Sequence, residues 1–484
     1  MDIILSIWSF FQTNILTQPA FFVGILVFIG YLLLKKPIYE AYAGFVKATV
    51  GYMILNVGSS GLVNTFRPIL AGLNQRFNLS AAVIDPYFGQ SAAMAALESV
   101  GRTTSLVMVG LLVAFLLNIL LVALRKITKL RTVFITGHIM VQQSTTGLWM
   151  IVFCFPALQD MTAVILLGIL LGLYWSVSSN LTVEATQNLT DGGGFAIGHQ
   201  QMFGVWFVDK LAPKLGKNSK KLEDVKLPGF LSVFNDNVVA TGTLMIIFFG
   251  IIIALLGPDL MAELDSSSTS MNFVFYIITT AFEFAVYLTI LQLGVRMFVA
   301  ELTESFTGIS ERLLPGSMPA VDCAATYGFG HPNAVTLGFV FGALGQFLAI
   351  IGLIVFQSPV LIITGFVPVF FDNATFAVFA NHKGGVKAAA ILTFVSGILQ
   401  VLGGAVCASM FQTAQYGGWH GNFDMDTIWL LGGAAMKYLT WGGYALCIII
   451  LLLIPQLQYR KNKENYFLIA EDYEAYKAKV GKES

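Results

Sequence analysis

Long apolar stretches recur along the chain, and short segments that hold most of the charged residues separate them. A helix needs about 20 apolar residues to cross the hydrocarbon layer of a bilayer. A membrane β-barrel would instead show segments of about ten residues with alternating polarity, which these stretches lack. The pattern predicts an all-α integral membrane protein with about eleven transmembrane helices. The stretches lie near residues 19–34, 45–63, 104–124, 132–155, 161–181, 238–257, 272–294, 335–356, 359–380, 388–411 and 428–454.

Two further segments mix charged and apolar residues in a way that does not suit a simple span. We interpret residues 66–103 as surface helices that lie along the membrane. Residues 295–315 alternate charged and apolar positions at helical spacing, which is typical of an amphipathic interfacial or connecting helix. The polar residues from Tyr459 onward predict a solvated helical tail. We therefore expect one polytopic membrane transport domain, residues 1–458, and a tail, residues 459–484.

The composition agrees with a membrane protein and excludes several other classes. Hydrophobic residues make up 56% and charged residues 11% of the 484 residues, whereas soluble domains carry about 25% charged residues. These values exclude a cytosolic enzyme, a disordered chain and a disulfide scaffold. Lys and Arg together number 27, as do Asp and Glu, so no basic excess favours a nucleic-acid partner. The four cysteines stand in apolar stretches without a CxxC pair, and we expect them to be buried small side chains.

The basic residues predict how the chain is oriented in the membrane. With an odd number of crossings, the Lys- and Arg-rich loops and the basic tail all fall on one side. The loops on the opposite side hold acidic residues such as Asp259, Glu263 and Asp424. Because cytoplasmic loops carry an excess of Lys and Arg, we expect a periplasmic N-terminus and a cytoplasmic C-terminus.

Polar residues gather in five segments within or beside the predicted spans. Polar groups are costly in hydrocarbon, so such clusters mark a solute pathway unless they have a structural role. The structural alternatives stay open: close packing of small residues for the first segment, an interhelical hydrogen bond for the second, a cytosolic loop for the third and a helix cap for the fourth. The five segments are residues 56–61, 136–143, 191–201, 319–333 and 371–385.

Three of these segments have the chemistry of a ligand site. His138 and Gln142 are four residues apart and share one helix face, where two neutral hydrogen-bonding side chains suit a hydroxylated ligand. The glycine-rich run before His199 and Gln200 fits the tip of a re-entrant hairpin, where the chain turns inside protein and offers donors to a solute. Asp322 stands among small and apolar residues, where it could accept from ligand hydroxyls, carry a proton or bind a cation.

The sequence also indicates an internal repeat and shows no catalytic signature. The dipeptide Gly-His recurs at residues 137, 198 and 330, which suggests an inverted repeat of two five-span halves and a final span. No histidine pair has the HxxxH spacing of a zinc site, and no phosphate-binding loop or nucleophile elbow is present. We therefore expect neither a metal nor a cofactor, and no catalytic residue of the chain itself.

The sequence resembles the L-ascorbate permease family of the bacterial phosphotransferase system from the first span to about residue 455. It departs from that family mainly in loops such as residues 412–424 and in the tail. The resemblance rests on GHIMVQQ at 137–143, TDGGGFAIGHQQMF at 190–203, KLPGFLSVFNDN at 226–237, VRMFVAELTESFTGISERLLPG at 295–316, AVDCAA at 320–325 and GFVPVFFDNATFAVFANHKGG at 365–385.

The resemblance implies the IIC component of a phosphotransferase system in the bacterial inner membrane, surrounded by lipid. Such a permease binds L-ascorbate from the periplasm and carries it inward, while separate IIB and IIA subunits supply the phosphoryl group. A homodimer with discontinuous core and scaffold parts, re-entrant hairpins and an elevator-type motion is implied as well. Residues similar to the family's substrate-binding positions are Gly58, Ser59, Tyr87, His138, Gln142, His199, Gln200 and Asp322.

The chemistry of these side chains suits ascorbate, a small, hydroxyl-rich monoanion. Glutamine, serine and histidine side chains can donate to its oxygens, and no Lys or Arg stands in the four segments that hold His138, His199, Asp322 and Gly58. Asp322 must then accept from a ligand hydroxyl or be protonated. A proton relay through Asp322 and the two histidines, in an H+- or Na+-coupled secondary transporter of a sugar acid, remains the alternative.

Overall fold

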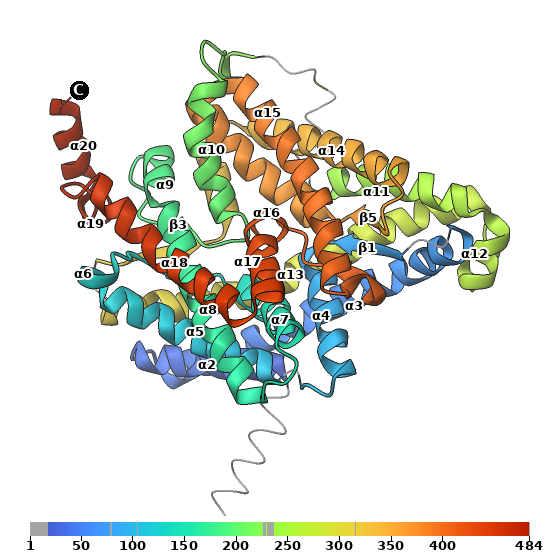
Figure 1. Ribbon diagram of the computed structural model, residues 1–484, viewed down its shortest axis with the longest axis horizontal. Coiled ribbons are helices and arrows are strands. Elements are labelled where there is room, and N and C mark those ends of the chain that lie inside the picture. Colours follow the sequence, from blue (N-terminus) through green and yellow to red (C-terminus); the bar gives the residue numbers. More distant parts are fainter. Residues whose placement is uncertain are drawn as a thin grey trace, which may run out of the picture.

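The computed structural model describes residues 18–77, 80–103, 105–225, 229, 237–314 and 316–483. The described chain is mainly helical, with short strands inside the bundle (Figure 1). The KLPGFLSVFNDN sequence lies almost wholly outside the described residues, as does the side chain of Ser59. The helices of the N-terminal half are α2 (Pro19–Leu33), α3 (Ile38–Phe77), α4 (Pro86–Ser99), α5 (Ser105–Ala123), α6 (Arg125–Thr128), α7 (Gly137–Cys154), α8 (Asp160–Leu181), α9 (Val183–Thr190) and α10 (Met202–Leu215).

The C-terminal half continues with longer helices and several short helical turns. The α-helices are α11 (Asn237–Leu256), α12 (Pro258–Leu264), α13 (Phe273–Leu313), α14 (Pro332–Val355), α15 (Asn373–Met410), α16 (Phe423–Asp426), α17 (Ile428–Leu439), α18 (Trp441–Lys461), α19 (Leu468–Glu471) and α20 (Tyr473–Glu483). The short turns are η2 (Leu222–Asp224), η4 (Ser266–Thr269), η5 (Cys323–Phe329), η6 (Pro368–Asp372) and η7 (Thr413–Tyr416).

Five described helical segments are long and apolar enough to cross a bilayer. They are Ser105–Ala123, Asp160–Thr190, Asn333–Val355, Pro368–Met410 and Trp441–Lys461. A sixth candidate results if Met245–Leu256 and Pro258–Leu264, which meet at 96°, form one broken span. The multi-pass membrane character is thereby confirmed, but the expected number of about eleven spans is not.

Two of the expected spans are interrupted rather than straight. The stretch at 359–380 begins as a strand and becomes helical only near Pro368. The helix then continues to Met410 through a kink at Gly385, where φ is 65° and a residue with a Cβ would be strained. The last stretch is divided at Thr440, which has a φ of 52°, into α17 and α18. Hydropathy cannot detect such breaks, because a short buried strand is as apolar as a helix.

Outward-facing apolar residues agree with a lipid environment. On α14, Leu344, Leu348, Ile351 and Val355 are all exposed and recur at helical spacing, while Ala349 on the same helix is buried. Such a continuous exposed apolar face is unusual for a water-soluble protein and normal for a helix in lipid. The described part of the chain therefore has the exterior that the composition predicts.

Within the described residues, six short strands form two small sheets, which corrects the expectation of an all-α chain. The first sheet has the order β5–β1–β6 and the second has the order β2–β4–β3, and every strand pair is parallel. In the registers, Ile84 lies opposite Thr364 and Phe134 lies opposite Ala320. Each sheet thus joins a central strand from one half of the chain to strands from the other. The strands are β1 (Ser80–Ile84), β2 (Thr132–Phe134), β3 (Ala196–Ile197), β4 (Met318–Val321), β5 (Val360–Thr364) and β6 (Gly418–Trp419).

The expectation of surface helices over residues 66–103 is wrong. The first third of this segment continues α3, and the rest forms strand β1 and helix α4, whose first half is buried. Asp85 is 1% exposed and caps α4 by accepting the amide of Tyr87, and it also accepts the amide of Val367. Asp85 is therefore satisfied by backbone amides inside the protein, whereas Arg67, Arg76 and Glu98 remain exposed.

The amphipathic segment at 295–315 is the second half of α13, a helix of 41 residues. Its acidic side chains pair with α2 and α3: the Tyr31 hydroxyl lies 2.7 Å from a carboxylate oxygen of both Glu301 and Glu304, and Lys47 donates to Glu301 over 3.0 Å. The hydrogen bonds from Lys36 and Tyr31 lower the pKa of Glu304, despite partial burial. The segment is thus a connecting helix whose charges hold two long helices together.

The C-terminal tail is only partly solvated. Tyr466 and Ile469 are fully buried, and Ile469 packs against Met318 and Ala320 of β4. Arg131, which precedes β2 and is 0% exposed, donates to the carbonyl oxygen of Tyr466 over 2.6 Å. The tail is therefore anchored beside the second sheet through Tyr466 and through Ile469 of α19.

Candidate functional site

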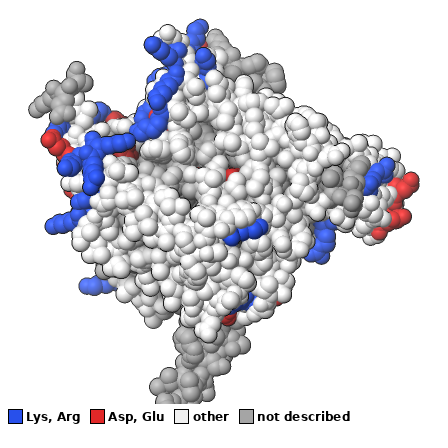
Figure 2. All heavy atoms as spheres, in the orientation of Figure 1, with Lys and Arg blue, Asp and Glu red and all other residues white. Residues whose placement is uncertain are grey.

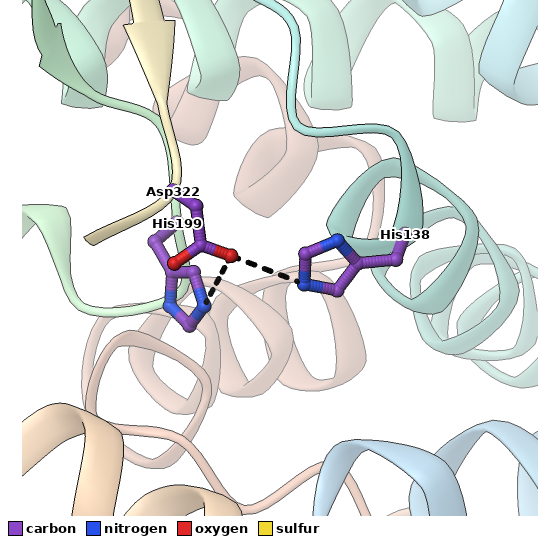
Figure 3. Close-up of side chains that lie close together, drawn as sticks. All are labelled: His138, His199 and Asp322. Atoms are coloured by element: carbon purple, nitrogen blue, oxygen red, sulfur yellow. Dashed lines mark ion pairs between the residues drawn. The ribbon is translucent and has the colours of Figure 1, made fainter. Parts of the chain in front are cut away.

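Three side chains from three separate elements meet at the carboxyl edge of the β2–β4–β3 sheet. His138 lies in the first turn of α7 after β2, His199 follows β3, and Asp322 follows β4. Because the strands are parallel, the residues after each strand lie at the same edge. The Nε2 atom of His138 lies 3.6 Å from Oδ2 of Asp322, and the Nε2 atom of His199 lies 4.0 Å from the same oxygen (Figure 3).

The two carboxylate oxygens of Asp322 have different surroundings. Oδ1 accepts the amide of Ala324 over 2.9 Å and so caps the η5 turn, as the structural alternative proposed. Oδ2 faces the two histidines. The side chain is 34% exposed, whereas His138 and His199 are 7% and 3% exposed. Asp322 is therefore held in place by its cap while one oxygen stays available to a ligand.

The protonation of His199 follows from its neighbours. Its Nδ1 atom lies 2.6 Å from Oε1 of Gln201, and the same oxygen accepts the amide of Gln200 over 2.9 Å. Because an amide oxygen only accepts, Nδ1 must carry the hydrogen. In the neutral imidazole, Nε2 then has a free lone pair that points toward Asp322. Gln201 is itself fixed, since its Nε2 donates to Thr375 over 3.2 Å.

His138 has no comparable partner for its second nitrogen. Its Nδ1 atom is buried and makes no hydrogen bond with the described residues. Its ring lies edge-to-face with that of His199, with 6.2 Å between the ring centroids. The Nε2–Oδ2 distance of 3.6 Å to Asp322 is too long for a good hydrogen bond. The ring nitrogens of His138 are therefore available for hydrogen bonds to a ligand.

A chain of neutral side chains extends from this cluster across the bundle. Gln200 donates from Nε2 to Oε1 of Gln142 over 2.7 Å, and the hydroxyl of Tyr87 lies beside the side chain of Gln142. On the other side, His420 contacts Oε1 of Gln200 through Nε2, and its Nδ1 lies 2.8 Å from Oγ1 of Thr146. The hydrogen bond between Gln142 and Gln200 joins α7 to the loop after β3.

The donors and acceptors of this chain can be assigned from one end to the other. Oε1 of Gln200 accepts, so Nε2 of His420 carries a hydrogen, and in the neutral ring Nδ1 accepts from Thr146. Oε1 of Gln142 accepts from Gln200, which leaves its amide nitrogen available to donate. The O–H of Tyr87, which lies beside Gln142, is a second donor available to a ligand.

Six of the eight expected site residues thus belong to one connected region. The described contacts do not join Gly58 to it; Gly58 is buried within α3, which continues through residues 56–61 without a break. Gly61 in the same segment has its Cα against the ring of Tyr287, so close helix packing explains this small residue. Ser59 cannot be compared, because its side chain is outside the described residues.

The glycine-rich run divides into an exposed and a buried part. Asp191, Gly193 and Gly194 are exposed, and Lys477 pairs with Asp191 over 2.8 Å. Gly198 through Gln201 are buried. The first part matches the cytosolic-loop alternative, whereas the second contributes to the cluster.

The remaining polar segments serve as structural connections. His331 caps α14 by accepting the amide of Asn333 over 3.2 Å, and it is not part of the cluster. Asp372 accepts from Asn422 over 2.8 Å and from Gln400 over 2.9 Å. Two hollows lie elsewhere, one apolar between α8, α17 and α18 and one between α3, α4 and η7. Neither is lined by the three clustered residues.

Sequence reasoning missed His420 and Gln201. His420 is 0% exposed and stands in the 412–424 loop, which was interpreted as a divergent connection. A histidine flanked by tryptophan and glycine, after a glycine-rich turn, was the available signal. Gln201 is adjacent to the expected pair His199 and Gln200, and its role depends on a backbone conformation that the sequence does not reveal.

Two comparisons with known proteins bear on the function. The family model described as "PTS system sugar-specific permease component" matches residues 14–438. A curated protein of Mycoplasma pneumoniae, named "Ascorbate-specific PTS system EIIC component", is 35% identical over 427 residues, which is 80% of this chain and 64% of the relative. The chain thus spans a little under two thirds of the length of that relative.

Proposed function

Because the chain belongs to the family of sugar-specific permease components of the phosphotransferase system, we propose that it is an ascorbate-specific IIC component that takes up L-ascorbate across the bacterial inner membrane. The name of the Mycoplasma pneumoniae relative supports this substrate. The sequence resemblance described above supports it independently of that name. The chain is a multi-pass membrane protein of this family, and the choice of substrate is the step that needs a test.

The observation that best supports the proposal is the convergence of Tyr87, His138, Gln142, His199, Gln200 and Asp322. These residues come from α4, α7, the loop after β3 and the end of β4. They form one region with neutral donors at one end and acceptors at the other. A hydroxylated monoanion needs both kinds of partner.

The two ends of the region suggest an orientation for the substrate. The Tyr87 O–H and the free N–H groups of Gln142 and Gln200 would donate to the negatively charged enediolate oxygens. The side-chain hydroxyls of ascorbate would donate to Asp322 and to the lone pair of His199. This orientation keeps the carboxylate of Asp322 away from the substrate's charge, so both can be ionised.

The finer features of the mechanism belong to the same proposal. Separate IIB and IIA subunits would phosphorylate the substrate at the cytosolic side, and the chain would act as a homodimer with moving core and fixed scaffold parts. Residues 1–458 would form the membrane domain and residues 459–484 the cytoplasmic tail. The two sheets, each of which joins a central strand from one half to flanking strands from the other, support an inverted repeat.

The distribution of charge supports a cytoplasmic C-terminus. Figure 2 shows that Lys and Arg side chains gather at the ends of the molecule, over α10 and over the α18–α20 segment, and that the middle of this face is nearly free of charge. This is the pattern expected when one end of a membrane protein faces the cytoplasm.

The decisive experiment is binding of radiolabelled L-ascorbate to purified protein, with other sugar acids and neutral sugars as competitors. We expect saturable binding that sugar acids compete for weakly and neutral sugars hardly at all. Uptake in cells should stop when the phosphotransfer partners are deleted. Uptake that persists without them and collapses with the ion gradient would instead identify a coupled secondary transporter.

A further inference from the structure

We propose that His138, His199 and Asp322 bind a divalent transition-metal ion of the Zn²⁺ type, and that the metal competes with the transported substrate for these three residues. The competition rests on the proposed function, whereas the metal binding does not. The metal would be an inhibitor of transport and not a cofactor.

The geometry of the three ligand atoms suits a small cation. Nε2 of His138, Nε2 of His199 and a carboxylate oxygen of Asp322 all lie within 4.8 Å of one another. Zinc binds imidazole nitrogen and carboxylate oxygen at about 2.0–2.2 Å in a tetrahedral arrangement, which places neighbouring ligand atoms about 3.3 Å apart. The distance of 3.6 Å between His138 and Asp322 already approaches this value. Closing the widest separation of up to 4.8 Å to this value requires side-chain movements that sum to about 1.5 Å.

The lone pairs of the cluster are directed toward the position that a metal ion would occupy. The hydrogen bond from Nδ1 of His199 to Gln201 leaves the lone pair of Nε2 directed at Oδ2 of Asp322. An imidazole whose outer nitrogen is held by an oxygen acceptor is the usual arrangement around a bound metal ion. Gln201 is in turn held by Thr375 and by the amide of Gln200.

Two acceptors of the cluster also face each other without a hydrogen-bond donor between them. The second oxygen of Asp322 is used by the Ala324 amide, so the carboxylate cannot turn away without losing its cap. Oδ2 and the Nε2 lone pair of His199 are two acceptors that face each other across 4.0 Å. With His199 neutral, a ligand hydroxyl or a cation between them would satisfy both. Two buried imidazoles and one carboxylate form the nitrogen-and-oxygen set that zinc and related ions prefer.

The expectation from sequence that no metal would bind does not apply to this arrangement. HxxxH spacing detects ligands on one helix, whereas these three ligands follow three strands that pair in a sheet. Three protein ligands leave a fourth tetrahedral position open. Because the metal would use the same acceptors as the substrate's hydroxyls, the two should exclude each other.

The first experiment measures metal binding to the full chain, purified without a histidine tag and treated with a chelator. Co²⁺ should give the strong visible absorption of a tetrahedral complex, and Zn²⁺ should abolish that signal by displacement. X-ray absorption of the Zn²⁺ complex of the unaltered protein should show two imidazole ligands and oxygen. Co²⁺ or Zn²⁺ that fails to bind at millimolar concentration, or that binds through sulfur, would overturn the proposal.

Variants then locate the site. His138→Gln, His199→Gln and Asp322→Asn should each lose the Co²⁺ signal, whereas His382→Gln, in the N-terminal part of α15 and outside the cluster, should keep it. Gln201→Leu should weaken metal binding by about 10–100-fold, because it removes only the partner that orients His199. Size-exclusion chromatography identifies any variant that fails to fold. If the folded His138→Gln and His199→Gln proteins bound the metal as tightly as the unaltered protein does, the proposed ligands would be wrong.

Competition separates this inference from the proposed function. Zn²⁺ should raise the apparent Kd of radiolabelled ascorbate in proportion to its concentration, and a chelator should reverse the effect. If ascorbate binds and Zn²⁺ does not, the inference fails and the proposed function stands. If Zn²⁺ binds to these residues and ascorbate does not, the proposed function fails, and with it the competition.

Discussion

His420 is hydrogen-bonded through Nε2 to Oε1 of Gln200, although the two residues are 220 positions apart in the chain. The contact joins the end of strand β6 to the loop after β3, so it connects the two small sheets at the candidate site. Since His420 also contacts Thr146 on α7, it fixes the orientation of the Gln200 amide from outside the ligand region. His420 is therefore a positioning residue for Gln200.

We expect His420→Ala to weaken ascorbate binding. Loss of the ring would leave Oε1 of Gln200 without a donor and let the amide turn over, which would present an acceptor to the substrate's negative charge. Leaving a buried polar group unpaired costs about 1–3 kcal/mol, or about 5- to 150-fold in affinity. Equilibrium binding of radiolabelled ascorbate measures this loss. His382→Ala is the matched control and should bind as the unaltered protein does; equal affinity in both variants would remove His420 from the network.

Gln142→Leu should weaken binding by about 1–3 kcal/mol for a related reason. Leucine has nearly the same volume but leaves Nε2 of Gln200 without its partner. The same binding assay applies, and thermal unfolding of the variant shows whether the bundle is intact. A folded variant with unaltered affinity would mean that the substrate does not approach this part of α7.

His199→Ala should abolish ascorbate binding while the protein still folds and assembles. The side chain lies at the centre of the cluster, and its removal would take away the acceptor that faces Asp322. Size-exclusion chromatography tests assembly, and radiolabelled binding tests the site. Retention of full affinity would exclude His199 from the substrate site and would leave its contact with Gln201 as a purely structural one.

The sequence predicted the residues of the site better than their arrangement. The spacing of His138 and Gln142 on one helix face and the isolation of Asp322 among apolar residues are local features, and both were visible. The meeting of His138, His199 and Asp322 depends on parallel pairing between strands of two to four residues. Such strands are too short to produce a periodic signal inside an apolar stretch, so the sheet could not be predicted.

The two ways in which Asp322 was interpreted turned out to be compatible. As a cap it uses Oδ1, and as a candidate ligand group it offers Oδ2. The prediction for residues 66–103 failed for the opposite reason, because every charge was assumed to need water. Asp85 shows that two backbone amides can replace that water in the interior.

The orientation of the chain can be tested with a reporter enzyme fused to the C-terminus. The Lys- and Arg-rich segments around α10 and α18–α20 predict that this end faces the cytoplasm. A reporter that is active only in the cytoplasm should therefore be active, and one that requires the periplasm should be silent. A fusion at Pro258, beside the acidic Asp259 and Glu263, should give the opposite result. A periplasmic signal from the C-terminus would show that the number of crossings is even.

Arg131→Ala should destabilise the protein and release the C-terminal tail. The guanidinium group is fully buried and donates to Oδ1 of Asn180 over 2.9 Å and to the carbonyl oxygen of Tyr466. It also pairs with Glu184 over 2.9 Å and lies 3.8 Å from the centre of the Tyr466 ring. Removing one partner of such a buried network typically lowers the free energy of unfolding by about 3–5 kcal/mol. Because Glu184 is partly exposed, we expect a decrease near the lower end of this range. Thermal unfolding should therefore occur at a lower temperature, and limited proteolysis should cut between α18 and α20 more rapidly.

Lys126→Ala, at a position that is not buried on the neighbouring α6, is the control and should change neither measurement. If the tail of the Arg131→Ala protein resists proteolysis as well as that of the control, the packing of Ile469 against β4, and not Arg131, anchors it.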